Sequence, residues 1–194
     1  MESLGHQYVH FDHRENIKQD LYIVQFGQMQ TAPGYSFGPA VRDHALIHFI
    51  RSGHGKLVVN DREHEIREGQ LFYIPADMSS FYQSDDREPW IYSYVGFSGV
   101  LADELIDAVG LTADTPIADI PDPAGLWNLL DRMKDNMSAQ NGYLYLMSGL
   151  YQLMVLISDV TAYAMDISGE HFGPSSMDHL TNRVIALLEQ DPAA

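Results

Sequence analysis

The fold is decided by the stretch from residue 46 to residue 99, which reads LIHFIRSGHGKLVVNDREHEIREGQLFYIPADMSSFYQSDDREPWIYSYVGFSG. Short runs of β-prone residues alternate here with turn signals at intervals of about 8–12 residues. Asn60 and Asp61 form a pair that is typical of hairpin turns. Pro75 ends its run, because proline donates no hydrogen bond to a strand ladder. The spacing predicts a sandwich or barrel of short strands, with sequence neighbours pairing antiparallel.

The same pattern extends upstream to about residue 20 and changes after Gly99. The expected strands are Leu21–Phe26, His44–Arg51, Lys56–Val59, Glu63–Arg67, Leu71–Ile74, Ser79–Gln83 and Trp90–Phe97. Downstream, apolar residues recur with helical spacing on either side of a connector rich in proline and aspartate. The expected helices are Val100–Val109, Leu126–Met137, Tyr143–Met165 and Met177–Gln190, with the connector at Leu111–Gly125 and a linker at His171–Ser176. The chain is therefore expected to be α+β and mainly β.

The expected helix Tyr143–Met165 is apolar on most of its circumference. One stripe consists of Leu146, Leu150, Leu153, Ile157 and Val160. Leu144, Met147, Tyr151, Met154 and Val155 add a second apolar side. Such a helix must be covered on most sides. It is either a core helix, or it packs one face on the barrel and the other on a second subunit.

Composition excludes several classes of function. The 194 residues include 27 acidic and 11 basic side chains, a formal net charge of -16 that repels phosphate backbones and anionic membranes. There are no cysteines, which excludes disulfides, thiolate zinc sites and cysteine nucleophiles. The N-terminus lacks the pattern of a signal peptide, and polar residues interrupt the most apolar stretch, Leu144–Val160. A soluble cytoplasmic protein without membrane contact is expected.

The stretch from residue 46 to residue 99 resembles the N-terminal arm of AraC-type transcription regulators, especially those of sugar operons. The matching pieces are Gly53-x-Gly55, the hairpin, Glu68-Gly69-Gln70, Pro75, Tyr82, Pro89-Trp90 and Gly96-Phe97-Ser98-Gly99. The resemblance implies a cupin-like β-barrel or jelly roll, followed by a C-terminal helical dimerisation segment. It assigns residues 1–99 to the effector-binding barrel with its N-terminal arm, 100–170 to helical dimerisation, and 171–194 to a linker and the start of a helix-turn-helix domain.

That helix-turn-helix half is absent from this sequence. His179–Gln190 is similar to the short helix that opens it. We therefore interpret the chain as a sensing half cut off before its DNA-binding half. It is expected to form a homodimer and to reach DNA only through the absent domain.

The resemblance to cupins also raises the question of a metal. Many cupins hold one with a His-x-His pair, a carboxylate and a third histidine after a proline-containing turn. Here Met78-Ser79-Ser80 follows that turn, and His48 has Leu46 and Ile50 two residues away on either side. His44, four residues before His48, does not converge with it on a strand. No metal, no other cofactor and no catalytic residue are therefore expected.

The candidate ligand site lies on the aromatic strands. Side chains alternate faces along a strand, so Trp90, Tyr92 and Tyr94 share one face, and Ser80 and Tyr82 share another. By resemblance, the positions of Tyr82, Tyr92 and Tyr94 line the effector pocket. Aromatic planes cover the apolar faces of a sugar while phenol hydroxyls bond its edge. The alternative is that these tyrosines are ordinary barrel core.

Two further residues and the N-terminal arm are weaker candidates. Arg42 reaches either the barrel mouth, where it suits vicinal hydroxyls or a carboxylate, or solvent. His48, in an apolar strand, is either a pocket residue or a core residue. The arm carries Tyr8, Phe11 and His13, and in the resembled regulators such an arm folds over the bound effector.

The leading hypothesis is an effector sensor for a small polar molecule, a mono- or oligosaccharide, that controls a carbohydrate-use operon. The competing class is a cupin-type sugar-modifying enzyme, such as an isomerase or a dioxygenase. A third interpretation is a dimerisation module whose pocket is vestigial.

Overall fold

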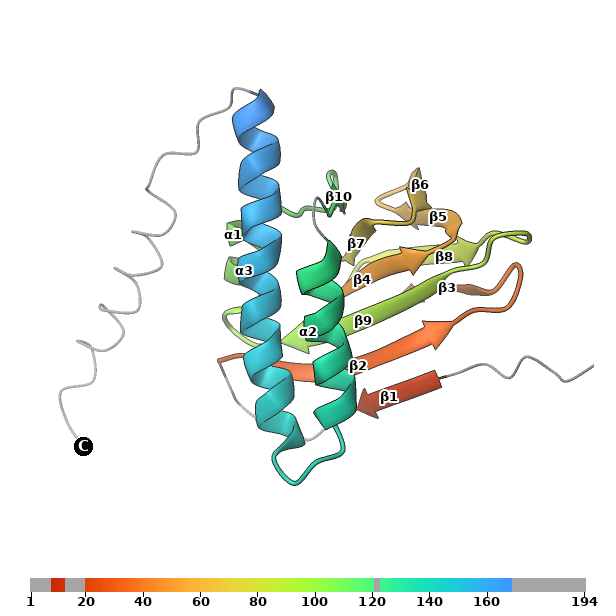
Figure 1. Cartoon of the computed structure of the whole chain (residues 1–194). Coiled ribbons are helices and arrows are strands. Elements are labelled where there is room, and N and C mark those ends of the chain that lie inside the picture. The colour runs from red at the N-terminus through yellow and green to blue at the C-terminus, as the bar shows by residue number, and fades with distance from the viewer. Residues whose placement is uncertain (1–7, 13–19, 121–122, 169–194) are drawn as a thin grey trace, which may run out of the picture.

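The computed structural model describes residues 8–12, 20–120 and 123–168, which form two β-sheets with helices on one side (Figure 1). The larger sheet has the strand order β1-β2-β9-β4-β7-β10, and the smaller has β3-β8-β5-β6. The strands are β1 (Tyr8–Asp12), β2 (Tyr22–Gln30), β3 (Ser36–Val41), β4 (Ala45–Ser52), β5 (His54–Val59), β6 (Arg62–Arg67), β7 (Gln70–Ile74), β8 (Ser79–Ser84), β9 (Ile91–Ser98) and β10 (Ile117–Asp119). The helices are α1 (Ala102–Ala108), α2 (Pro123–Asn136) and α3 (Gly142–Ser168). All pairings between these strands are antiparallel. The prediction of a mainly β, cupin-like jelly roll followed by helices is confirmed.

The hairpin between β5 and β6 turns where the sequence predicted it. Asn60 and Asp61 have positive φ angles of 50° and 56°, the left-handed pair that a two-residue type I′ turn requires. Val59 consequently pairs with Arg62 and Gly55 with Ile66. The turn thus sets the register that places Leu57 and Ile66 in the barrel interior.

The larger sheet is buried on both faces at its centre. In β4, the residues from Ala45 to Ile50 are all buried, and so are those from Tyr92 to Phe97 in β9. One set of alternating side chains packs inside the barrel, including Leu46, Ile50 and Tyr92. The other set belongs to a second core, under the helices. Neighbouring residues on these strands therefore serve two different cores.

The helices close that second core over the outer face of the larger sheet. In Figure 1, α2 and α3 run side by side in front of β2 and β9. Leu130 of α2 and Leu150 of α3 are fully buried in the same cluster as Ile23 of β2 and Ile47 of β4. The predicted boundary between the barrel and the helical segment falls at residues 99 and 100. One hydrophobic core includes residues from both sides of that boundary.

This packing corrects the interpretation of the α3 stripe as a dimer interface. Leu146, Leu150, Leu153 and Ile157 are 0–1% exposed within the single chain. They face the sheet and α2, so they have no surface to offer a second subunit. The side chain of Val160 lies outside the described residues. Among the α3 residues whose side chains the structure describes, the large apolar ones that are exposed are Leu144, Tyr145, Tyr151 and Val155.

Three strands were not expected from the sequence. β3 lies between two expected strands, β10 lies within the expected connector, and β1 comes from the N-terminal arm. β1 forms the edge of the larger sheet and pairs with β2, where Tyr8 is opposite Met29 and Phe11 is opposite Phe26. His13, the expected linker and the expected last helix lie outside the described residues. Among the described helices, none is long and apolar enough to cross a membrane.

Candidate functional site

The interior of the barrel gathers an aromatic cluster around Tyr82. The side chain of Tyr82 points inward from β8, and its ring centroid lies 5.0 Å from that of His48 on β4. The ring of Trp90, just before β9, lies 6.4 Å away, and the Arg42 guanidinium carbon lies 5.9 Å away. Tyr82 therefore sits where side chains from both sheets meet.

His48 lies at the centre of the larger sheet. Its Cα pairs with Tyr94 on β9 and with Phe72 on β7. The imidazole stacks on the ring of Phe72, at 4.4 Å and 11°, and meets Tyr92 edge-on at 4.9 Å. It is 1% exposed, and its Nδ1 has no hydrogen-bond partner among the described residues.

The burial of His48 determines its charge. Burial holds its pKa well below the ordinary 6.5, and the nearby positive charge of Arg42 lowers it further. His48 is therefore neutral near pH 7, with one ring nitrogen that donates and one that accepts. A neutral imidazole offers either kind of hydrogen bond to a polyhydroxyl ligand.

The two central tyrosines are kept protonated. Burial raises the pKa of Tyr82 to about 12, although the positive charge of Arg42 opposes the shift. Burial also raises the pKa of Tyr92, and the neighbouring Tyr82 adds to this. The Tyr92 hydroxyl donates a hydrogen bond to Sδ of Met29, at 3.2 Å. Both phenols therefore keep a proton to donate and add no charge to the interior.

Arg42 follows β3 and turns its side chain toward the barrel. Its guanidinium carbon lies 4.3 Å from the centroid of the Phe37 ring, a cation–π geometry, and 5.9 Å from the centroid of the Tyr82 ring. One guanidinium nitrogen, Nη1, is buried without a hydrogen-bond partner in the part of the chain that the structure describes. Of the two positions left open by the sequence, the structure places Arg42 at the barrel rather than in solvent.

Four buried polar atoms around Tyr82 lack hydrogen-bond partners among the described residues. They are Arg42 Nη1, His48 Nδ1, Ser80 Oγ and Trp90 Nε1. Ser80 is on the same face of β8 as Tyr82, two residues earlier, and is 2% exposed. Buried polar groups in folded proteins are nearly always satisfied. The Arg42 and Trp90 nitrogens donate hydrogen bonds, and the Ser80 hydroxyl can donate or accept one. Together with the His48 ring nitrogen, and surrounded by aromatic rings, these atoms could form hydrogen bonds with a bound polar molecule.

Ring and cation contacts link six of the seven residues that the sequence singled out for ligand contact: Arg42, His48, Tyr82, Trp90, Tyr92 and Tyr94. The seventh, Ser80, is buried two residues before Tyr82 on β8. Sequence reasoning missed Phe37 and Phe72, which sandwich the cluster from two strands. The sequence did contain a signal for Phe72. It is an aromatic residue in a short apolar strand, and strand alternation places it on the face opposite to Tyr73.

Two other histidines, His44 and His54, make polar contacts outside this cluster. His44, on the outer side of the sheet, hydrogen-bonds with Gln25 through Nε2 and pairs with the Asp43 carboxylate through Nδ1. His54 pairs with Glu88 in the open, where both side chains are exposed. In the described ranges, no group of three or more His, Asp or Glu side chains is arranged to hold a metal ion.

A polar contact connects the barrel to the helices. Asp131 of α2 accepts hydrogen bonds from Gln28 of β2, at 3.0 Å, and from Arg51 of β4, at 2.9 Å. Burial raises the pKa of Asp131, but these two hydrogen bonds and the positive charges of Arg51 and Lys134 together outweigh it and hold the pKa below its ordinary value. The Arg51 guanidinium also lies over the ring of Trp127, 5.1 Å from its centroid. β2 and β4 place Met29 and His48 in the barrel interior. On their outer side, the same two strands therefore contact α2 through Asp131.

Comparison with known proteins gives a consistent result. The family described as "AraC-like ligand binding domain" matches residues 22–154. The chain is 42% identical over 87 residues to the Msm operon regulatory protein of Streptococcus mutans, an alignment that covers 45% of this chain and 31% of that protein. It is 33% identical over 93 residues to the raffinose operon transcriptional regulatory protein of Pediococcus pentosaceus, covering 47% of this chain and 34% of that protein. The matched part spans about a third of the length of these relatives.

Solved structures are similar only at a distance. A Cupin 2 conserved barrel domain protein from Salinispora arenicola is 14% identical, with a TM-score of 0.37, and the match covers 50% of this chain and 80% of that one. The cupin domain of Schizosaccharomyces pombe Cnp3 is 12% identical, with a TM-score of 0.40, covering 50% and 69%.

Proposed function

Because this chain belongs to the family of AraC-like ligand binding domains, we propose that its barrel binds a mono- or oligosaccharide as the sensing part of a transcription regulator. The observation that carries the proposal is the set of four unpartnered buried polar atoms around Tyr82. Sugars present hydroxyls at their edges and apolar C–H faces, which this combination of polar atoms and aromatic rings complements. Two relatives named as operon regulators, one of them for a raffinose operon, support the class of ligand.

Binding rather than catalysis is proposed for this site. The residues around Tyr82 are aromatic rings, two protonated phenols, a neutral imidazole and one guanidinium. Such groups hold and orient a neutral ligand, whereas the lowered pKa of His48 and the raised pKa values of Tyr82 and Tyr92 suit them poorly to proton transfer near pH 7. The relatives' names as regulators favour the same conclusion.

Sugar binding is proposed to act through the larger sheet. A ligand contacts the inner residues of β4 and β9, while the outer residues of β2 and β4 hold α2 through Asp131. The ligand shifts the arrangement of the helices only to the extent that it binds one arrangement better than the other. Contact with DNA is assigned to a DNA-binding half outside this acidic segment.

The proposal includes a homodimer built on the exposed side of α3. Leu144, Tyr151 and Val155 are separated by seven and four residues, so they form one stripe on the helix surface. They are 66%, 49% and 59% exposed. Large apolar side chains gathered on one exposed helix face mark an interaction surface, and a second copy of the chain is the proposed occupant.

Calorimetry with a panel of sugars tests the ligand. We expect saturable binding of at least one of raffinose, melibiose, sucrose, galactose and glucose. Arg42→Gln removes the guanidinium and is expected to weaken that binding by about tenfold or more, because hydrogen bonds from charged donors contribute about 1.5–3 kcal/mol. Arg62→Gln, an exposed arginine on β6, is the matched control and is expected to bind like the wild type. Equal loss in both variants, or tight binding of an unrelated metabolite alone, contradicts the sugar assignment.

A further inference from the structure

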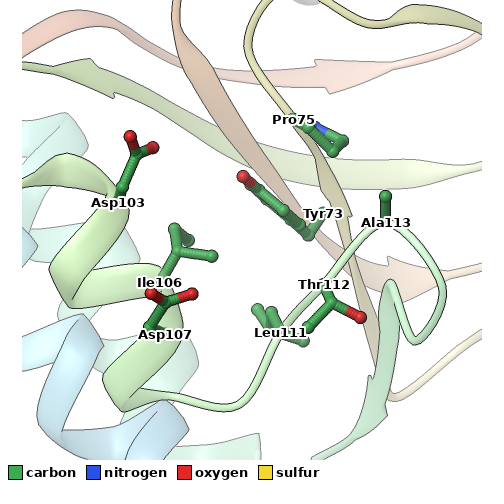
Figure 2. Close-up of a pocket in the computed structure, with 8 residues that line it drawn as sticks. All are labelled: Tyr73, Pro75, Asp103, Ile106, Asp107, Leu111, Thr112 and Ala113. Atoms are coloured by element: carbon green, nitrogen blue, oxygen red, sulfur yellow. The ribbon is translucent and has the colours of Figure 1, made fainter.

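A pocket lies on the opposite side of the larger sheet from the barrel interior. It is a cavity of about 240 Å³, lined by Tyr73, Pro75, Asp103, Ile106, Asp107, Leu111, Thr112 and Ala113. Its walls come from β7, from α1 and from the loop that leads to β10 (Figure 2). Phe72 and Tyr73 are neighbours on β7, so the two sites lie on opposite faces of one strand.

The pocket combines apolar walls with negative charge. The side chains of Ile106 and Leu111 are 3% and 1% exposed and form a dry floor. Asp103 and Asp107 are exposed on α1, one helical turn apart. Neither carboxylate has an ion pair or hydrogen-bond partner among the residues that the structure describes. The lining contains no basic side chain.

A buried phenol points into this pocket. Tyr73 is 6% exposed, and Figure 2 shows its hydroxyl directed across the cavity toward Asp103. This hydroxyl has no hydrogen-bond partner within the described ranges. Burial and, to a smaller extent, the charges of Asp103 and Asp107 together raise the pKa of Tyr73 to about 12. A negative field therefore reaches the hydroxyl from both carboxylates, and no basic side chain among the lining residues balances it.

We propose that this pocket is a binding site for a primary ammonium group on a short aliphatic stem. The ammonium group carries three donors and one positive charge, which suit the Asp103 and Asp107 carboxylates and the Tyr73 hydroxyl oxygen. The stem lies against Ile106 and Leu111. The cavity is smaller than the about 300–1,000 Å³ of pockets for drug-sized ligands, so a small amine or a single lysine side chain fits its size.

The chemistry of the lining excludes the opposite ligand class. An anion would meet two unpaired carboxylates, and bringing a like charge close to them is unfavourable. A neutral alcohol of the same shape would gain the apolar contacts and the phenol hydrogen bond, but not the attraction of the two charges. The ammonium group is the ligand that uses both carboxylates and the Tyr73 hydroxyl.

The test is a titration of the whole 194-residue chain, followed by two-dimensional amide NMR, with n-butylammonium and with n-butanol as its neutral counterpart. We expect saturable shifts at Tyr73, Leu111 and Thr112 with n-butylammonium, at least tenfold stronger than with n-butanol, and weakened by added salt. Equal binding of both probes, or shifts spread evenly over the acidic surface, overturns the proposal.

Variants sharpen the assignment. Asp103→Asn with Asp107→Asn is expected to weaken n-butylammonium binding by about tenfold, whereas Glu65→Gln with Asp86→Asn removes two exposed charges elsewhere and leaves it unchanged. Tyr73→Phe retains the ring and is expected to cost several-fold, with an unaltered melting temperature. Equal loss in the two double variants would overturn the site.

The source of the ammonium group is a separate arm of the test. Lysine blocked at both ends of its backbone is titrated in parallel with n-butylammonium. Tighter binding of the blocked lysine assigns the pocket to a polypeptide side chain, and tighter binding of n-butylammonium assigns it to a free amine. Sugar binding in the barrel is measured separately, so failure of either site leaves the other test intact.

Discussion

At the scale of single residues, His48 is the side chain whose burial has the clearest energetic consequence. Its imidazole is stacked between aromatic rings in a sheet that is buried on both faces. In the unfolded chain the same imidazole is solvated, with a pKa near 6.5. The folded protein holds the pKa well below that value, so protons bind the unfolded chain preferentially.

This difference predicts a pH dependence of stability. The contribution of a neutral His48 is complete above about pH 6.5 and is lost as the pH falls from there toward the lower folded-state pKa. We expect the free energy of unfolding by urea to fall by up to about 1.4 kcal/mol per pH unit below pH 6.5 from this group. His48→Phe keeps the stack on Phe72 and is expected to flatten the slope between pH 6.5 and 5.5.

His54→Gln serves as the control, because His54 is exposed and paired with Glu88. It is expected to keep the slope of the wild type. A slope in His48→Phe as steep as in the wild type would mean that the folded protein accepts a proton on His48 as readily as the unfolded chain.

The sequence predicted that Trp90, Tyr92 and Tyr94 share one face of their strand, but not which residues of other strands contact that face. Alternation along a strand was enough to put Trp90, Tyr92 and Tyr94 on one face. It does not reveal which residues of non-adjacent strands meet that face, since this depends on the curvature that closes the barrel. Phe37 was missed for that reason, and so was the pocket at Tyr73, whose parts are about thirty residues apart in the chain.

At the scale of elements, the contact between α2 and α3 depends on a glycine. A Cβ added at Gly149 of α3 would lie 2.5 Å from Sδ and 2.6 Å from Cγ of Met133 on α2. Small residues permit close approach of two helices, and here the space beside Gly149 is filled by methionine. Gly125 of α2, in contrast, has no neighbouring atom within 4 Å of such a Cβ.

The two glycines predict opposite effects of one substitution. Gly125→Ala is expected to stabilise the protein by about 0.5–1 kcal/mol, because alanine loses less backbone entropy in a helix. Gly149→Ala has the same propensity gain but overpacks the helix contact, which costs about 1–3 kcal/mol, so a net loss is expected. Urea denaturation of both variants measures the difference. Equal stabilisation by both would show that Met133 moves aside without cost.

The sequence identified β2 and the strands from β4 to β9, including the three with the most buried pattern. β4, β7 and β9 are rich in apolar and aromatic residues, and their expected bounds agree with the structure within two residues. β3 was missed because SFGPAV contains Gly38-Pro39, lacks alternation and is mostly exposed. β10 has three residues and exists by pairing with β7, which no local pattern reveals.

At the scale of the whole molecule, the question left by α3 is which surface faces a partner. The sequence showed a helix that is apolar nearly all round, and it gave no means of telling the sheet side from the partner side. The structure assigns Leu150 and Ile157 to the core under the sheet. The proposed dimer therefore depends on Leu144, Tyr151 and Val155.

That assignment predicts distinct results for two kinds of glutamate substitution. Tyr151→Glu with Val155→Glu is expected to halve the mass in light scattering, from twice 21.8 kDa to a folded 21.8 kDa monomer. Leu150→Glu buries an unpaired charge and is expected to unfold the chain. An unchanged dimer in the exposed double variant, with its circular dichroism intact, would place the interface on another face.

The larger sheet has a practical consequence for protein engineering. Along β4, residues 46, 48 and 50 face the barrel interior and residues 45, 47 and 49 face the helices. Mutations that retune ligand preference can therefore be confined to one set of alternating positions, together with 92 and 94 of β9. The other set can be held constant to keep the contacts with the helices. A combinatorial library built this way would vary the lining of the barrel while leaving the core under the helices unchanged, because the two sets alternate along the same strands.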